Sequence, residues 1–393
     1  MSISDLKHTL RKHEFPTCAR EAFPKIEQLL VGRSAPSSKQ LDIAMDIISE
    51  FVFCEADRRG RRGLNSLQEL QLIDIICDYI SSCSNETTKN TIFLSLFGGM
   101  ESQRKLKILS ILASMAVSAS STPVLLAVGV WLQQMGSSSP QSLQLVENII
   151  RDHFHLNTTN QAALKSLATT APQFVSNFIT AVTELYMHDG INEKKLPPRN
   201  LLEVITSWVC SNPTLCMSAQ MNPAALPSGA IPMAAVTPLA GLIHWCSLAP
   251  LYVEDDDDQE IPIKKLKLEE DIKKPVAKSE STQALYWQLH LGVLNSLRGG
   301  WRPHGPPTAL AAARLAALAP KLQAHAHRLH ATGLDLTIHP KLQDCLDRVG
   351  QAVQVALAAG CVYGNITNLL TALDTLPENR LLKIIIKKHQ QSL

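Results

Sequence analysis

The chain has 393 residues, enough for two or three ordinary domains or for one extended array of helical repeats. Its 37 basic and 35 acidic residues nearly balance, which excludes a strong overall field that would recruit nucleic acid or a membrane surface. The nine cysteines are odd in number and lie mostly in apolar helical patterns, and the first residues carry no apolar core of a signal peptide. These features predict an intracellular protein with reduced thiols.

Four arginines crowd a short loop early in the chain: Arg58, Arg59, Arg61 and Arg62. We consider three roles for them, in order of preference: a solvated or import-related loop, contact with an acidic protein partner, and contact with RNA phosphates. RNA comes last because no aromatic residues are interleaved for base stacking, and charge alone gives affinity without specificity.

A helix is predicted directly after this loop, beginning at Ser66. Ser66 and Glu69 fit the spacing of a capping box. Apolar side chains cover most of the helix, and only a narrow stripe that includes Asp74 and Asp78 is polar. We expect burial on two sides, as in stacked helical layers, and carboxylates that are solvated or paired with a neighbouring cation rather than catalytic.

Two long runs, residues 108–146 and 204–253, contain no Asp, Glu, Lys or Arg. Turn-forming residues break the first into pieces of about ten residues, and prolines interrupt the second throughout. A membrane-spanning helix needs ~20 consecutive apolar residues. The sequence therefore predicts buried helices here and no membrane span.

The remaining segments indicate helix after helix. Proline follows a Ser, Thr or Asn at the head of several apolar-periodic segments, which is the position where a helix tolerates it. Pro172, Pro198, Pro340 and Pro377 take similar positions without the ideal capping residue before them. No run alternates with a period of two between hairpin turns. The predicted class is all-α. Short connections and doubly buried helices favour a HEAT/armadillo-like helical-repeat solenoid over an irregular bundle, although the helix starts follow no strict period.

An uncharged segment of 20 residues runs from Met217 to Val236 and contains Met217, Met221, Met233 and several prolines. It is more apolar than an ordinary exposed loop. Either it packs back on its own core, which we slightly prefer, or it meets a partner through its adaptable methionines.

One charged stretch divides the chain. Residues 254–281 hold ten acidic and six basic residues and too few apolar ones to form a core, which predicts a disordered linker. Its Lys264, Lys265 and Lys267 form a weak candidate for nuclear import. We predict an N-terminal helical repeat domain at 1–253 and a second helical domain at 282–393.

Sequence motifs for catalysis are missing. There is no Walker A loop, dinucleotide fingerprint, zinc-protease motif, nucleophile elbow or C-x-x-C pair. The histidine cluster His325 to His330 lacks a nearby carboxylate or cysteine, so an exposed polar helix face is expected rather than a metal site. No enzyme, cofactor or small-molecule substrate is predicted.

Short strings in a fixed order resemble the Integrator complex subunit 15 family. The most recognisable string is Leu64 to Leu72. Others, in chain order, are 50–53, 114–117, 131–133, 178–186, 237–246, 289–294 and 346–356. The acidic tract 254–258 and the alanine- and histidine-rich segment 304–332 depart from the family pattern.

The resemblance implies a helical, non-catalytic subunit of the nuclear Integrator complex, which cleaves nascent RNA polymerase II transcripts, including small nuclear RNA precursors. It also implies contact with the module of subunits 10, 13 and 14, which the family helps to tie to the core. A helical adaptor that binds nucleic acid through Arg58 to Arg62 is the alternative hypothesis.

Overall fold

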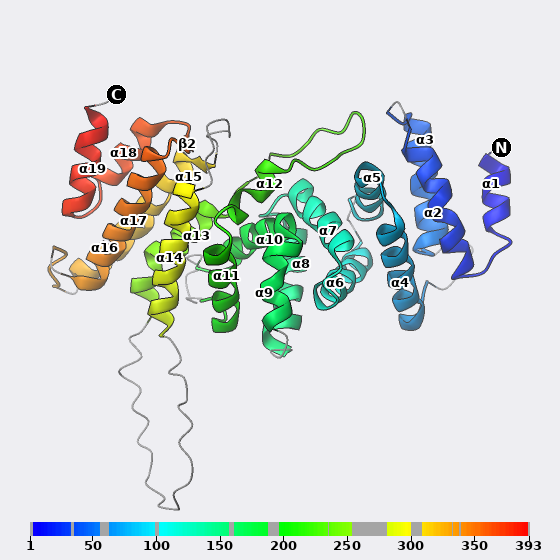
Figure 1. Cartoon of the computed structure of the whole chain (residues 1–393), viewed down its shortest axis with the longest axis horizontal. Coiled ribbons are helices and arrows are strands. Elements are labelled where there is room, and N and C mark those ends of the chain that lie inside the picture. Colours follow the sequence, from blue (N-terminus) through cyan, green and yellow to red (C-terminus); the bar gives the residue numbers. More distant parts are fainter. Residues whose placement is uncertain are drawn as a thin grey trace, which may run out of the picture. The chain divides into compact units, whose positions relative to one another are not determined.

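The computed structural model (Figure 1) describes residues 3–32, 35–55, 63–98, 102–156, 161–187, 196–234, 236–253, 281–299, 309–331, 333–337 and 339–391. Within these ranges the chain is almost entirely helical. The sole β pairing described is one parallel bridge between β1 (Leu310–Ala311) and β2 (Val362–Tyr363). The predicted all-α class is confirmed. The predicted sites at Arg58 to Arg62 and Lys264 to Lys267 lie outside the described residues.

Two compact units make up the chain. Unit 1 comprises Met1–Leu185 and Ser218–Val236, and unit 2 comprises Tyr186–Met217 and Thr237–Leu393. The chain thus passes from one unit to the other three times. This grouping by contacts differs from the division into 1–253 and 282–393, which stays a prediction.

Unit 1 is a stack of consecutive helices in which each packs against its next neighbours, as α4 packs on both α6 and α7, and α10 packs on α7, α8 and α9. Its elements are α1 (Ile3–Leu10), α2 (Thr17–Leu30), α3 (Ser38–Ile47), the π-helical turn η1 (Ile48–Val52), α4 (Ser66–Ser82), α5 (Glu86–Phe97), α6 (Gln103–Ser118), α7 (Thr122–Met135), α8 (Pro140–Ile150), the π-helical turn η2 (Arg151–Leu156), α9 (Gln161–Thr170), α10 (Pro172–Leu185) and α12 (Ser218–Met221).

The core of unit 1 is continuous between these layers. Trp131 of α7 is fully buried, and its indole nitrogen donates to the Phe97 carbonyl of α5 over 2.9 Å. The helices α7 and α10 approach closely at Gly129, where an added Cβ would lie 2.9 Å from the Phe174 Cα. Asn177 donates to the Gly129 carbonyl at the same crossing. Large side chains fill the layers, and a small residue sets the distance between two of them.

Unit 2 joins segments from both sides of residues 254–280. Helices α11 and α13 pack against α14, and α13 and α14 pack against α17. Its elements are α11 (Arg199–Ser211), the 3₁₀ turn η3 (Leu215–Met217), α13 (Leu239–Tyr252), α14 (Thr282–Gly299), β1, α15 (Ala312–Ala316), α16 (Leu318–Ala331), α17 (Pro340–Ala358), β2, α18 (Ile366–Asp374) and α19 (Arg380–Gln390).

Helix α4 begins at Ser66 as predicted, but the predicted capping residue was wrong. Asn65, not Ser66, caps the helix: its side chain accepts from the Gln68 amide, and the Gln68 side chain accepts from the Asn65 amide. Glu69 is instead buried and pairs with Arg104 and Lys107 of α6. Because Arg104 and Lys107 of α6 hold the Glu69 carboxylate, the Gln68 carboxamide serves in the capping box instead.

Several helices begin at a proline as predicted, and other predicted starts differ from the structure. Helices α8, α10 and α17 begin at their prolines. Asn212-Pro213 begins only a 3₁₀ turn, and α19 begins three residues after Pro377 because Asn379 caps it. Thr237 uses its hydroxyl to donate to the Ala309 carbonyl, so it does not cap α13. In the described part of the chain, no helix is long and apolar enough to cross a membrane.

Candidate partner-binding site

The segment Ser218–Val236, called the strap below, belongs to unit 1 although the residues on either side of it belong to unit 2. It begins with the short helix α12 and continues as a drawn-out loop that passes α7 and α5 (Figure 1). All of it except Ala235 is described, and it contains no Asp, Glu, Lys or Arg. The strap contains two of the three predicted methionines, and the third directly precedes it.

Two carboxamides hold the outgoing limb of the strap. The Gln173 side chain of α10 donates to the Asn222 carbonyl over 3.3 Å, and the Asn90 side chain of α5 donates to the Ala225 carbonyl over 2.9 Å. Both donors are buried, Asn90 to 3% exposure. Because these bonds go to backbone oxygens, they fix the path of the limb without depending on its side chains.

The tip of the strap is a tight turn. The Ala230 amide donates to the Pro227 carbonyl over 3.1 Å, and Gly229 has a φ of +83°. That backbone conformation is open to glycine and strained for other residues. The tip lies against Ala35, just before α3.

The returning limb is held at Met233 and, less closely, at Val236. Gln133 of α7 donates to the Met233 carbonyl over 3.2 Å, and the Gln134 side chain accepts from the Met233 amide over 3.4 Å. The Thr180 hydroxyl of α10 lies 3.5 Å from the Val236 carbonyl. With its backbone held in this way, the Met233 side chain is left half exposed.

The apolar side chains of this region divide into a buried and an exposed set. Met217 is 2% exposed, which makes it part of the core of unit 2. Met221 and Met233 are 57% and 50% exposed, Val236 is 42% exposed, and Ile231 is 86% exposed. Met217 thus packs in a core, as the preferred alternative expected, whereas the exposed set leaves the choice between the two alternatives open. Whether Met221 and Met233 contact a partner stays a prediction.

The side chains that hold the strap were missed in the sequence. Asn90, Gln133 and Gln134 lie 99 to 135 residues away from the strap residues they bind. One signal was available: Thr88, Lys89, Asn90 and Thr91 form a run of polar residues that are all buried in α5. A polar run at buried positions of a helix indicates that it binds something other than an apolar neighbour.

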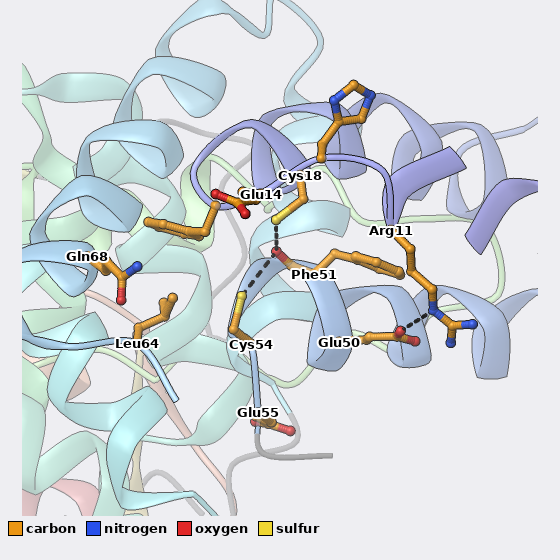
Figure 2. Close-up of a pocket in the computed structure, with 11 residues that line it drawn as sticks. Arg11, Glu14, Cys18, Glu50, Phe51, Cys54, Glu55, Leu64 and Gln68 are labelled. Atoms are coloured by element: carbon orange, nitrogen blue, oxygen red, sulfur yellow. Dashed lines mark hydrogen bonds and ion pairs between the residues drawn. The ribbon is translucent and has the colours of Figure 1, made fainter. Parts of the chain in front are cut away.

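A polar pocket of about 520 Å³ lies between α2, η1 and the start of α4 (Figure 2). Its lining includes Glu55 and Leu64, which flank the undescribed residues 56–62 with their four arginines. Cys18 and Cys54 point from different elements toward the Phe51 carbonyl, at 3.6 and 3.8 Å. Their thiols are therefore engaged as donors in a structural role.

Three of the charged side chains that line this pocket form ion pairs. Arg11 donates to Glu50 over 2.8 Å. Burial alone would raise the pKa of Glu55, but hydrogen bonds from Ser49 and Lys105 and the positive charge of Lys105 lower it overall. Glu55 is thus held as a carboxylate, which suits an ion pair and not a general acid.

Among the residues that the structure describes, the other candidate groups do not converge on a reaction centre. Asp78 pairs with Arg20 of α2 at 3.5 Å, as predicted for a polar stripe, and Asp74 is exposed. Burial raises the pKa of Cys216 and of Cys246 to about 12, so neither thiol ionises near neutral pH. Within the described ranges, no three His, Cys, Asp or Glu side chains gather as metal ligands.

Comparison with known proteins identifies the family. The family model described as Integrator complex subunit 15 matches residues 4–378. The chain is 36% identical over 407 residues to "Integrator complex subunit 15" of Drosophila melanogaster, with all of both chains covered. It is 30% identical to the Mus musculus protein of that name and 29% identical to the Homo sapiens one, covering 98% of this chain and 87% of each relative. The chain belongs to the Integrator complex subunit 15 family.

Proposed function

We propose that this protein is a non-catalytic scaffold subunit of the Integrator complex and that the exposed face of the strap is one of its contacts with other subunits. The family is named for a subunit of a complex and not for a reaction. The observation that carries the proposal is a set of exposed apolar side chains, Met221, Ile231, Met233 and Val236, on a segment fixed by hydrogen bonds.

A fixed apolar surface of this kind suits protein binding for two reasons. Burying apolar area in an interface contributes about 25 cal/mol per Å² before the costs of association. A segment whose backbone is already held loses less conformational entropy on binding than a free loop. Methionine side chains also adapt to the shape of a partner.

The finer role follows from the family resemblance and is likewise proposed. The subunit works in the nucleus and links the module of subunits 10, 13 and 14 to the core, in 3'-end processing of small nuclear RNA and in attenuation of RNA polymerase II transcription. The nuclease lies elsewhere in the complex. Arg58, Arg59, Arg61 and Arg62 remain candidates for a second contact, and Lys264, Lys265 and Lys267 for import.

Copurification tests this function. Tagged full-length protein, mixed with recombinant subunits 10, 13 and 14 from the same organism, is expected to retain at least one of them at physiological salt. Changing Met221, Ile231 and Met233 together to Ser is expected to lower the affinity at least about tenfold, because interface energy concentrates in a few central side chains.

Matched control variants come from the same unit. Leu67 and Leu156 are exposed to 67% and 75% and lie outside the strap. Their change to Ser should alter the affinity less than about twofold, as expected for exposed sites away from an interface. Retention of none of the three subunits by the wild-type protein would contradict the proposed role.

A further inference from the structure

A groove of about 370 Å³ lies beside the tip of the strap. One wall is the backbone of Pro227 to Ala230, and the other comes from α2, α5, α3 and the residues just before α3. No charged side chain lines it. Its lining residues are Leu30, Ala35, Pro36, Leu41, Thr91, Leu94, Ser95, Pro227, Ser228, Gly229 and Ala230.

The rim of this groove is apolar and open to solvent. Leu41 is 43% exposed and Met45, one turn further along α3, is 42% exposed. Ile231, which directly follows the tip, is exposed to 86% and is the most exposed large apolar side chain in the described part of the chain. Apolar side chains therefore continue from the groove lining at Ala230 to Ile231 on the returning limb.

The returning limb also offers unused backbone groups. Within the described residues, the N–H and C=O groups of Ile231 have no hydrogen-bond partner, and neither do the amides of Gly229 and Ala234. All three residues are exposed. Pro232, which has no N–H, and Met233, which α7 already holds, separate these free groups. Each free group can still hydrogen-bond to another extended chain, as groups at the edge of a sheet do.

We propose that an extended, uncharged segment of a partner protein hydrogen-bonds to the free backbone groups of Gly229, Ile231 and Ala234 and places one large apolar side chain in the groove. The inference rests on the proposed function, since the partner is another subunit of the same complex. It adds the conformation and the chemistry of the segment that is bound.

Three observations select this occupant. A helix has its backbone groups satisfied internally, so it would leave the free groups of Ile231 unpaired, whereas an extended chain can pair with them. A groove without charged lining disfavours a charged side chain, because that side chain would lose its hydration without gaining an ion pair. The groove volume lies at the lower end of the roughly 300–1,000 Å³ of ligand sites, which fits a side chain better than a whole helix.

Two measurements on the full-length protein test this inference. The probe is the recombinant subunit 10, 13 and 14 assembly. Hydrogen–deuterium exchange across residues 228–234 should slow at least about tenfold when the assembly binds, because free amides become hydrogen-bonded. Leu41→Glu, at an exposed site in the groove, should weaken binding at least about tenfold, and Leu67→Glu should change it less than about twofold.

The outcomes separate this inference from the function on which it rests. If wild-type protein binds the assembly but Leu41→Glu binds equally well, or the 228–234 amides are not protected, the inference is wrong and the proposed function stands. If the protein alone forms a dimer that Leu41→Glu abolishes, the occupant is a second copy, and the inference is again wrong. If wild-type protein binds none of the assembly, both fall together.

Discussion

Carboxamide side chains position the strap. Three of them, Asn90, Gln133 and Gln134, use only part of their hydrogen-bonding capacity. Among the described residues, Asn90 Oδ1, Gln133 Oε1 and Gln134 Nε2 are buried without a partner. A buried unpaired polar atom costs about 1–3 kcal/mol, which offsets much of what the formed bonds contribute. The hydrogen bonds therefore define the position of the strap but contribute little net free energy to holding it there.

This balance predicts a small effect on stability and a large one on local opening. Replacing Asn90 by Ala removes one hydrogen bond and one unpaired oxygen together, so the free energy of unfolding should fall by no more than about 1 kcal/mol. Hydrogen exchange at Ala230, whose amide is bonded to the Pro227 carbonyl at the end of this limb, should speed up at least about fivefold. Asn148→Ala is the control, because that side chain donates to Ser110 away from the strap. Unchanged strap exchange in Asn90→Ala would show that Asn90 does not hold the limb.

A buried histidine makes unit 2 sensitive to acid. Burial lowers the pKa of His290 below its usual value of 6.5, as does Arg348, while the Gln351 hydrogen bond and Asp344 act against this. Its Nε2 lies 3.0 Å from the Gln351 Oε1, and its ring packs near Trp287. The neutral ring is thus the form that the fold accepts.

The sign of the resulting pH dependence follows from linkage. Above pH 6.5 the ring is neutral in both folded and unfolded chains, and the stability is fully present. Below it, the unfolded chain takes up a proton that the folded one resists, so stability falls as the pH drops through 6.5 toward the folded pKa. Urea midpoints of His290→Gln should fall less between pH 7 and 5 than those of wild type. Burial also lowers the pKa of His153, so the urea midpoints of both wild type and His290→Gln should still fall somewhat as the pH drops.

At the scale of elements, helix starts show where a sequence pattern stops being informative. The residues around Asn65 offer two overlapping capping boxes, Asn65 with Gln68 and Ser66 with Glu69. Local spacing alone does not separate them. The choice depends on α6, whose Arg104 and Lys107 bind Glu69 and remove it from the cap.

Substitution at the two positions distinguishes the caps. Asn65→Ala should lower the free energy of unfolding by about 1 kcal/mol, the usual cost of losing a capping side chain. Ser66→Ala should change it by less than about 0.5 kcal/mol, because the side chain is exposed and makes no capping bond. Chemical denaturation measures both. The reverse order would restore the cap predicted from the sequence.

Much of the element pattern was predictable, and the site was predictable only in part. The apolar positions of α4 predicted its buried face, where Leu72, Ile73 and Ile76 are fully buried, but Leu70 of the same pattern is 47% exposed. The uncharged segment Met217 to Val236 stood out by composition, because a loop in water seldom lacks charge. The side chains that hold it could not be found, since hydrogen bonds between residues about 100 positions apart leave no local pattern.

At the scale of the whole molecule, an uncharged contact surface has a measurable signature. Association through the strap and its groove should change less than about twofold between roughly 0.1 and 0.5 M salt, because no charged side chain lines either. Binding of RNA through Arg58 to Arg62 would instead weaken steeply over this range. Biolayer interferometry with the subunit assembly and with single-stranded RNA separates these outcomes. A steep salt dependence for the assembly would assign its contact to the arginines and not to the strap.

The order in which the ribosome makes this chain does not match the order in which unit 1 is completed. Helices α1 to α10 have all been synthesised once Leu185 emerges, but the strap follows only after α11 and η3, which belong to unit 2. At about 5–20 residues per second the strap arrives several seconds later. During that interval Asn90, Gln133 and Gln134 lack the strap backbone groups to which they bond in the complete unit.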